Sequence, residues 1–231
     1  MTRLVLCFLG PLLLAAMVGL LATVLGLGGT AVSIAIYLAE LVGALVLIRA
    51  WVPGAAGLTA IGTIAALALA VGLGLARGLS WLVVIPVERI DVGAAALVGL
   101  GYATVVAVAE EVHFRGLVLG ALSSRFGTGR ALMLSAALFA VPHAFLNGVL
   151  WIPLFVADGL LFGALRLRTG SVVPPIVAHL LGNFLTGAVL VAPRIVDDRI
   201  AVTYLVLALA VDASAVLLLL RPPRLPQRVP A

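Results

Sequence analysis

The fold is decided by the stretch VGAAALVGLGYATVVAVAEEVHFRGLVLGAL, residues 92–122, which is almost entirely apolar. A transmembrane helix needs about 20 apolar residues to cross roughly 30 Å of hydrocarbon, and this stretch is longer than that. Two glutamates, a histidine and an arginine interrupt it. They are Glu110, Glu111, His113 and Arg115. Because an ionisable side chain in a membrane span costs roughly 2.5–3.5 kcal/mol, each needs a partner and is a candidate for function.

The rest of the chain is similarly apolar. Of its 231 residues, 64% are hydrophobic and only 10% are charged, whereas soluble domains are about half apolar and a quarter charged. Glycine, proline and arginine residues divide the chain into segments of suitable length. We place eight spans, near residues 4–26, 31–51, 55–76, 92–122, 129–148, 150–168, 171–193 and 200–220. The predicted fold is an all-α polytopic transmembrane helix bundle of about eight spans.

Two segments are expected outside the spans. LSWLVVIPV, residues 79–87, is too short to cross a membrane and is predicted to lie at the interface, anchored by Trp81. The segment RPPRLPQRVPA, residues 221–231, is predicted to be a polar cytoplasmic tail. Residues 1–220 then form a single integral-membrane domain, with residues 92–193 as the core that carries the polar motifs.

The arginines predict the orientation of the bundle. All fourteen basic residues are arginine, and with a cytoplasmic N-terminus nine fall inside, four fall outside and Arg115 lies within the membrane. The inside set is Arg3, Arg49, Arg125, Arg130, Arg166, Arg168, Arg221, Arg224 and Arg228, and the outside set is Arg77, Arg89, Arg194 and Arg199. Because cytoplasmic loops are enriched in basic residues, both termini are predicted to be cytoplasmic. This placement explains the net charge of +5 without a nucleic-acid partner.

The two glutamates differ in the partners that their own helix offers. Arg115 lies four residues after Glu111, one turn away on the same face, and glutamate before arginine is the favourable order. Glu110 points about 100° around the helix from Glu111, so another helix must satisfy it. His113, three residues after Glu110, either contacts that glutamate or faces the headgroups, and we interpret it as a packing residue.

Two later spans carry polar residues at helical spacing. FAVPH places Phe139 and His143 one turn apart, and HLLGN does the same for His179 and Asn183. Pro142 predicts a local irregularity that exposes backbone groups. Counted at about 1.5 Å per residue, the first glutamate and these polar groups lie roughly 12–22 Å from the cytoplasmic ends of their spans. They are expected to meet in one water-accessible cavity that opens towards the cytoplasm.

Together these residues resemble the CAAX prenyl protease and bacteriocin-processing family of intramembrane glutamic endopeptidases. The family motif EExxxR is present at residues 110–115, FxxxH at residues 139–143 and HxxxN at residues 179–183. Each motif alone is weak, but their order on successive spans is specific. The resemblance covers this central third of the chain, and His113 stands where an apolar residue is expected.

The resemblance implies hydrolysis of a peptide bond by four catalytic side chains. Glu110 and His143 would activate a water molecule as a general base, so that no covalent intermediate is needed. His179 and Asn183 would donate hydrogen bonds to the carbonyl oxygen as it gains negative charge.

Three further residues are expected to support these four. Glu111 and Arg115 would hold the helix and the first glutamate in place, and Phe139 would pack beside them. No metal and no cofactor is expected. The implied partners are membrane lipid and a peptide or protein substrate, including membrane-associated or lipidated ones, and the implied location is the plasma membrane of a prokaryote.

Other interpretations remain open. Glu110, His143 and His179 could instead hold zinc, although no HExxH motif is present and the single cysteine, Cys7, cannot supply a site of several thiolates. A transporter could use buried charges as a pathway, but the paired broken helices typical of transporters are not found. A non-catalytic membrane scaffold or bacteriocin-immunity type protein would keep the polar cluster only to organise the bundle.

Three other acidic residues fall within predicted spans. They are Glu40, Asp158 and Asp212. Because no motif includes them, we interpret them as structural charges or as hydrogen-bonding partners between helices.

Overall fold

The computed structural model describes residues 1–52, 54, 57–58, 62–90, 92–191 and 198–220. This part of the chain is almost wholly helical, which confirms the all-α polytopic bundle. Seven of its helices are long and apolar enough to cross a membrane. The protein is therefore an integral membrane protein. The predicted tail, residues 221–231, lies outside the described residues.

The seven membrane-spanning segments follow one another along the chain. They are α1 (Thr2–Val24), α2 (Gly29–Trp51), α3 (Ile64–Val84), the continuous α4 (Ala94–Glu111), η1 (Val112–Val118) and α5 (Leu119–Phe126), then α6 (Thr128–Asn147), the continuous η2 (Val149–Trp151) and α7 (Ile152–Thr169), and α9 (Asp198–Leu220). The predicted seventh span is shorter, consisting of α8 (Val173–Phe184) and η3 (Leu185–Val189). Strands β1 (Arg89–Ile90) and β2 (Leu190–Val191) form one short antiparallel pair at an end of the bundle.

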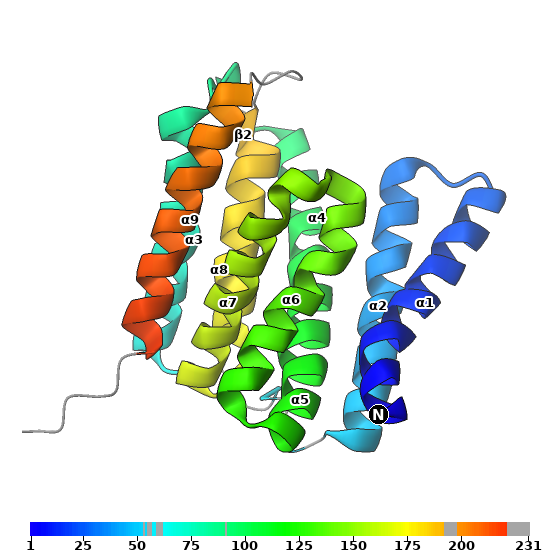
Figure 1. Ribbon diagram of the computed structural model, residues 1–231. Helices are drawn as coiled ribbons and strands as arrows, with labels where there is room; N and C mark the ends of the chain where they lie inside the picture. Colours follow the sequence, from blue (N-terminus) through cyan, green and yellow to red (C-terminus); the bar gives the residue numbers. More distant parts are fainter. Residues whose placement is uncertain (53, 55–56, 59–61, 91, 192–197, 221–231) are drawn as a thin grey trace, which may run out of the picture.

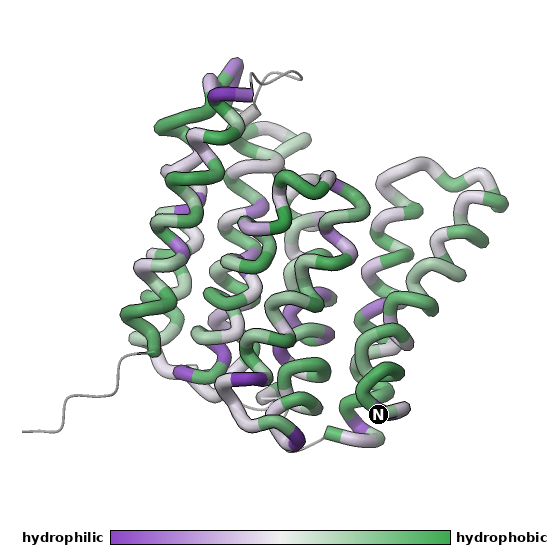
Figure 2. The backbone as a smooth tube through the Cα atoms, in the orientation of Figure 1, coloured by the Kyte–Doolittle hydropathy of each residue, from purple (hydrophilic) through white to green (hydrophobic). Residues whose placement is uncertain are grey.

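The helices form a central group with a pair on one side. Figure 1 shows α4, α6, α7 and α8 in the centre, α3 and α9 along one side, and α1 with α2 along the other. The helix surfaces in Figure 2 are mostly hydrophobic, with hydrophilic positions at the two ends and scattered inside the central group. This is the distribution that a bundle surrounded by lipid requires, because only buried or terminal polar groups avoid the hydrocarbon.

Small residues let the central helices approach closely. A Cβ added to Gly74 of α3 would lie 2.6 Å from the Cβ of Leu181 and 2.8 Å from the carbonyl oxygen of Ala178, both in α8. In the same way, a Cβ on Gly159 of α7 would lie 2.7 Å from the Cα of Ala136 in α6. Close backbone approach at glycine replaces the hydrophobic driving force that is missing between helices in lipid.

The third span differs from the sequence prediction. It runs from Ile64 to Val84 rather than over residues 55–76, because the Thr63 side chain accepts a hydrogen bond from Ala66 N and caps the helix there. The predicted interfacial segment, residues 79–87, is wrong for this reason, since its first six residues complete α3. Trp81 packs edge-on against Tyr204 of α9 instead of anchoring a loop.

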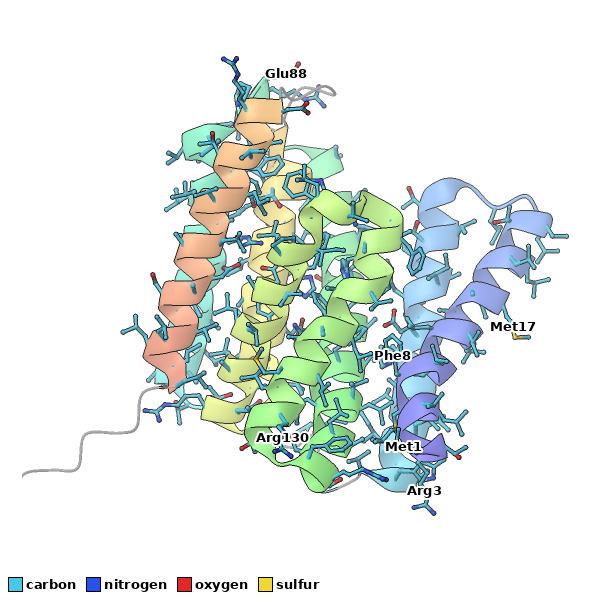
Figure 3. The ribbon with its side chains drawn as sticks, in the orientation of Figure 1. Met1, Arg3, Phe8, Met17, Glu88 and Arg130 are labelled. Carbon is cyan, nitrogen blue, oxygen red and sulfur yellow. The ribbon has the colours of Figure 1, made fainter. Side chains whose placement is uncertain are left out.

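This shift also moves one arginine. Arg77, predicted to lie in an outside loop, lies within α3, and that part of the prediction is wrong. Figure 3 shows Arg3 and Arg130 at one end of the bundle and Glu88 at the other, as the alternation of the spans predicts. We call the end that holds Arg3 and Arg130 the arginine-rich end. Arg194, Arg221, Arg224 and Arg228 lie outside the described residues.

Candidate active site

The two glutamates end α4 at a change of helix type. Glu110 and Glu111 are the last residues of α4, and η1, which follows directly, is a π-helix. A π-helical turn inside an α-helix is rare, and such turns are frequent at functional sites. Both glutamates are buried within the bundle, with 5% and 0% of their surface exposed. Their charges therefore depend on neighbouring side chains rather than on water.

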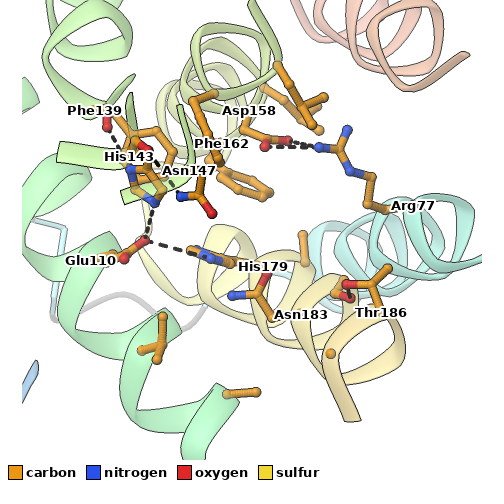
Figure 4. A pocket seen from close by; sticks show the side chains of 18 of the residues that line it. Arg77, Glu110, Phe139, His143, Asn147, Asp158, Phe162, His179, Asn183 and Thr186 are labelled. Carbon is orange, nitrogen blue, oxygen red and sulfur yellow. Dashed lines mark hydrogen bonds and ion pairs between the residues drawn. The ribbon is translucent and has the colours of Figure 1, made fainter. Parts of the chain in front are cut away.

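Glu110 meets the two histidines that the motifs predict. Its Oε2 lies 3.6 Å from Nε2 of His143 on α6 and 3.8 Å from Nε2 of His179 on α8 (Figure 4). Both separations are longer than a direct hydrogen bond, so this oxygen faces the two rings without bonding directly to either. Residues from three helices thus converge as the sequence predicts.

Glu111 is held by two partners. Its Oε2 lies 3.1 Å from Nε of Arg115, the expected pair one turn apart. Its Oε1 lies 2.9 Å from Nδ1 of His179, a contact that the sequence analysis did not predict. The two glutamates therefore approach opposite nitrogens of the same imidazole. Glu111 can fix the orientation of His179, as a carboxylate does for a histidine in other hydrolytic sites.

His143 is fixed from its other nitrogen. Nδ1 lies 2.8 Å from the carbonyl oxygen of Phe139, one turn earlier in α6. Its ring also packs against the rings of Phe139 and Phe155, with centroids 4.4 and 4.5 Å away. Helix α6 continues through Pro142, so the predicted irregularity is not a break in the helix. These contacts aim Nε2 of His143 at Glu110.

Phe139 packs between the supporting and the catalytic candidates. The guanidinium of Arg115 lies 4.2 Å from the centre of the Phe139 ring, a distance suited to a cation–π contact. Phe162, which no motif includes, stacks on the His179 ring at 5.1 Å with an angle of 11° between the planes. The two aromatic rings therefore support Arg115 and His179 from apolar sides.

The polar residues line one cavity of about 400 Å³. Glu110, His143, His179 and Asn183 all contribute to its wall. Asn183 has an exposed side chain, unlike the buried Glu110, and so its amide is accessible from the cavity. The volume is within the range of small-molecule and substrate sites, roughly 300–1,000 Å³.

The cavity extends from Glu110 in one direction. Its lining residues in α4 are Gly99, Tyr102, Ala103, Val106 and Glu110, which lie between β1 and the glutamate. Asn147 at the end of α6 also lines it, at the end opposite to the arginine-rich end. If the arginine-rich end is cytoplasmic, the cavity extends from Glu110 away from the cytoplasm, whereas the sequence analysis expects it to open towards the cytoplasm. Residue counts along the helices predict how deep the motifs lie in the membrane. The direction in which the cavity extends depends instead on which side chains leave space around the motifs.

A second charged cluster in the cavity wall was not predicted. Arg77 of α3 pairs with Asp158 of α7 and Asp212 of α9, at 2.7 and 2.5 Å. The two aspartates lay unpaired in the sequence analysis because Arg77 was placed in a loop. We call these three residues the acidic triad. Two aspartates within predicted spans, with Arg77 directly after a third, were the signal that could have linked the three residues.

His113 and Glu40 form a further buried pair. Nδ1 of His113 lies 2.7 Å from Glu40 Oε1 in α2, and Nε2 lies 3.0 Å from the carbonyl oxygen of Cys7 in α1. Both groups can be satisfied only if the histidine and the carboxylate share one extra proton. The pair joins α1 and α2 to η1, directly after the two glutamates. His113 is therefore neither a partner of Glu110 nor a residue that faces the headgroups.

The Glu40→Leu variant is expected to lose stability, because it leaves Nδ1 of His113 buried without a partner. An unsatisfied buried polar group costs about 1–3 kcal/mol, which should lower the midpoint of unfolding in a denaturing detergent. The double variant Glu40→Leu with His113→Leu removes both groups and should recover part of that loss, but not the hydrogen bond between His113 Nε2 and the carbonyl oxygen of Cys7. Equal midpoints for the single variant and the unmodified protein would show that the pair contributes nothing.

Histidine and carboxylate side chains are also common ligands of metal ions. Within the described ranges, no group of three or more histidine, cysteine, aspartate or glutamate side chains has the arrangement of a metal site. Histidines whose Nδ1 is bonded to a carbonyl or carboxylate, as in His143 and His179, are nevertheless common among metal ligands.

Comparison with known proteins supports the resemblance for the central region. Residues 92–185 match the family model described as type II CAAX prenyl endopeptidase Rce1-like. The chain is also 36% identical over 76 residues to a protein of Bacillus subtilis (strain 168) named "Putative membrane peptidase YdiL". That match covers 33% of this chain and 30% of the relative, so the chain spans less than a third of the length of the relative that it matches. No solved structure matches.

Proposed function

We propose that the protein is an intramembrane endopeptidase, which hydrolyses a peptide bond with a water molecule activated by Glu110 and His143. The observation that carries the proposal is the approach of Glu110 Oε2 to the Nε2 atoms of His143 and His179 in one cavity. The match of residues 92–185 to an endopeptidase family model supports the same reaction class.

The hydrogen-bond partners assign the protons on the two rings. Nδ1 of His143 faces a carbonyl oxygen and Nδ1 of His179 faces the carboxylate of Glu111, and both of these groups only accept hydrogen bonds. Each Nδ1 therefore donates, and each Nε2 faces Glu110. In neutral His143, Nε2 is an acceptor. A water molecule beside Glu110 would donate to both acceptors, so that together they can remove its proton.

The charges around the glutamates favour one added proton. Glu110 and Glu111 carry two negative charges and Arg115 carries one positive charge, so the cluster is neutral only with one proton more. We assign that proton to His179, because both of its nitrogens face carboxylates: Nδ1 lies 2.9 Å from Glu111 Oε1 and Nε2 lies 3.8 Å from Glu110 Oε2. Protonated His179 then carries a donor on Nε2 as well, pointing into the cavity.

The reaction then proceeds without a covalent intermediate. The water oxygen adds to the carbonyl carbon of the substrate while one of its protons passes to Glu110, and Nε2 of His143 accepts a hydrogen bond from the remaining O–H. Nε2 of His179 and the amide of Asn183 donate to the oxygen that becomes negative; loss of one such donor elsewhere costs about 10²–10³ in rate. The tetrahedral species collapses as the C–N bond breaks, and the stored proton passes to the leaving nitrogen.

We further propose that the arginine-rich end faces the cytoplasm of a prokaryotic cell. The support is the excess of arginine at that end. The substrate is then a peptide or protein segment that enters the cavity from the outer half of the membrane or from its outer surface.

The test compares the peptides in membranes of cells that contain the unmodified protein or the Glu110→Gln variant. Mass spectrometry should find peptide termini that depend on Glu110, and the purified protein should produce the same cuts in synthetic peptides. Membranes with identical peptide termini in both strains would contradict an endopeptidase and favour a scaffold. Solute flux into proteoliposomes would instead indicate a transporter.

Activity is expected to survive removal of metal ions. In the proposed mechanism the base and the oxyanion donors are side chains, so exhaustive chelation should change turnover by less than about twofold. The measurement is peptide cleavage before and after dialysis against a chelator, with metal content determined on the same samples. Stoichiometric zinc, together with chelator-sensitive activity that zinc restores, would replace the general-base role of Glu110 by metal ligation.

A further inference from the structure

The acidic triad lies in the wall of the same cavity as Glu110 but outside all three motifs. Arg77, Asp158 and Asp212 come from α3, α7 and α9, and each contributes to the lining. Figure 4 draws Arg77 and Asp158 on one side of the Phe162 ring, with Glu110 and His143 on the other. The cavity therefore has two polar regions, and the proposed chemistry uses only one of them.

The triad has one positive group and two negative groups. Nη2 of Arg77 lies 2.7 and 2.9 Å from the two oxygens of Asp158, and Nη1 lies 2.5 Å from Oδ2 of Asp212. Oδ1 of Asp212 is fully buried and has no hydrogen-bond partner among the described residues. Asp212 itself is 1% exposed. With both carboxylates ionised, the triad carries an uncompensated negative charge.

Such a charge is costly inside a membrane bundle unless a cation or a donor compensates for it. Arg115 does not do so, because its guanidinium pairs with Glu111 and reaches only the backbone oxygen of Asp158, at 3.4 Å. Arg77 is already shared between the two aspartates. The remaining acceptor, Oδ1 of Asp212, therefore has no donor among the described residues, although Asp212 belongs to the cavity wall.

Helix α8 connects this acceptor to the proposed reaction centre. Asn183, the oxyanion donor, is preceded by Gly182, whose Cα hydrogen faces Arg77: an added Cβ would lie 3.5 Å from the Arg77 Cγ. Because Gly182 has no side chain, Arg77 packs directly against α8 beside Asn183, and both Asn183 and the triad line the same cavity.

We propose that the acidic triad is a specificity subsite that binds a cationic group of the substrate, namely the ammonium of lysine, the guanidinium of arginine or a free amino terminus. The cation would donate to Oδ1 of Asp212 and neutralise the excess charge. This inference rests on the proposed endopeptidase function, and it adds the substrate class: segments with a basic group at a fixed distance from the cut.

The first test uses the Glu110-dependent peptide termini themselves. Lysine or arginine should occur at one fixed position relative to the cut, or the cut should lie at a fixed distance from a free amino terminus. Synthetic peptides separate these two sources: acetylation of the lysine side chain blocks the first and acetylation of the amino terminus blocks the second. Acetylation of the amino group that the subsite binds should reduce kcat/KM roughly tenfold or more.

The second test changes the triad without leaving a buried charge unpaired. Asp212→Asn leaves Arg77 paired with Asp158 alone, a balanced pair, and should remove the preference for the free over the acetylated cation. Asp212→Glu keeps the charge and is the matched control, which should keep the preference. A purely structural role would lower activity on both peptides equally.

The outcomes separate the two proposals. Glu110-dependent cuts without any basic preference in the unmodified protein would overturn the subsite and leave the endopeptidase standing. An unchanged preference in Asp212→Asn would also overturn the subsite, because Asp212 would then be neutral or without contact to the substrate. Absence of all Glu110-dependent cuts would overturn both. If Asp212→Asn does not fold, the peptide comparison on the unmodified protein still decides.

Discussion

The Glu110→Gln variant is expected to lose about 10²–10⁴-fold in turnover, the usual contribution of a general base, while it folds and inserts normally. Glutamine has nearly the same shape as glutamate but cannot take up the proton of the attacking water. The fold should survive because Glu111 and Arg115 remain a neutral pair after the charge of Glu110 is removed. The glutamine amide can also donate to Nε2 of His143, which lies 3.6 Å from Oε2 in the unmodified protein.

Two measurements on the same preparation check this expectation. Cleavage of a synthetic peptide gives the loss of turnover, and the midpoint of detergent-induced unfolding gives the change in stability. Asn147→Ala serves as a control at the cavity wall, because the contact of Asn147 within the described part of the chain is donation to the backbone oxygen of His143, at 3.1 Å. Turnover of Glu110→Gln within a few-fold of the unmodified protein would remove Glu110 from the reaction.

Much of the fold could be predicted from the sequence because lipid imposes a simple length rule. Six of the predicted spans fall on α1, α2, the α4 to α5 stretch, α6, α7 and α9, since apolar runs of about 20 residues have few alternatives in a membrane. The predicted bounds of the third span were wrong because the apolar run there is longer than one helix. There, the start at Thr63 is set by a side-chain cap rather than by hydropathy.

The convergence of the motif residues was also predictable, because helical spacing and depth are both countable from the sequence. The partners of the remaining charges were not. Arg77 meets Asp158 and Asp212 over separations of 81 and 135 residues, and His113 meets Glu40 over 73. Spacing along one helix gives no information about such contacts, which depend on how the helices rotate and pack.

The Glu111→Gln variant is expected to lose stability as well as activity, in contrast to Glu110→Gln. Glu111 and Arg115 are 0% and 1% exposed, so the substitution leaves a buried guanidinium without its carboxylate. Breaking a buried ion pair from one side typically costs about 3–5 kcal/mol. The unfolding midpoint and the yield of inserted protein should both fall. Equal stability of the two glutamine variants would remove the basis for giving the two glutamates different roles.

The double variant Glu111→Leu with Arg115→Leu separates the two functions of Glu111. Replacing a buried pair by apolar residues is often neutral or stabilising, so the unfolding midpoint should return towards that of the unmodified protein. Turnover should not return, because Nδ1 of His179 has lost the carboxylate that lies 2.9 Å away and sets the direction of its Nε2 donor. Recovery of both would mean that Glu111 acts only through Arg115 and that the proposed orientation of His179 has no part in the reaction. Recovery of stability alone would show that a single buried carboxylate holds the helix through one oxygen and directs the oxyanion donor through the other.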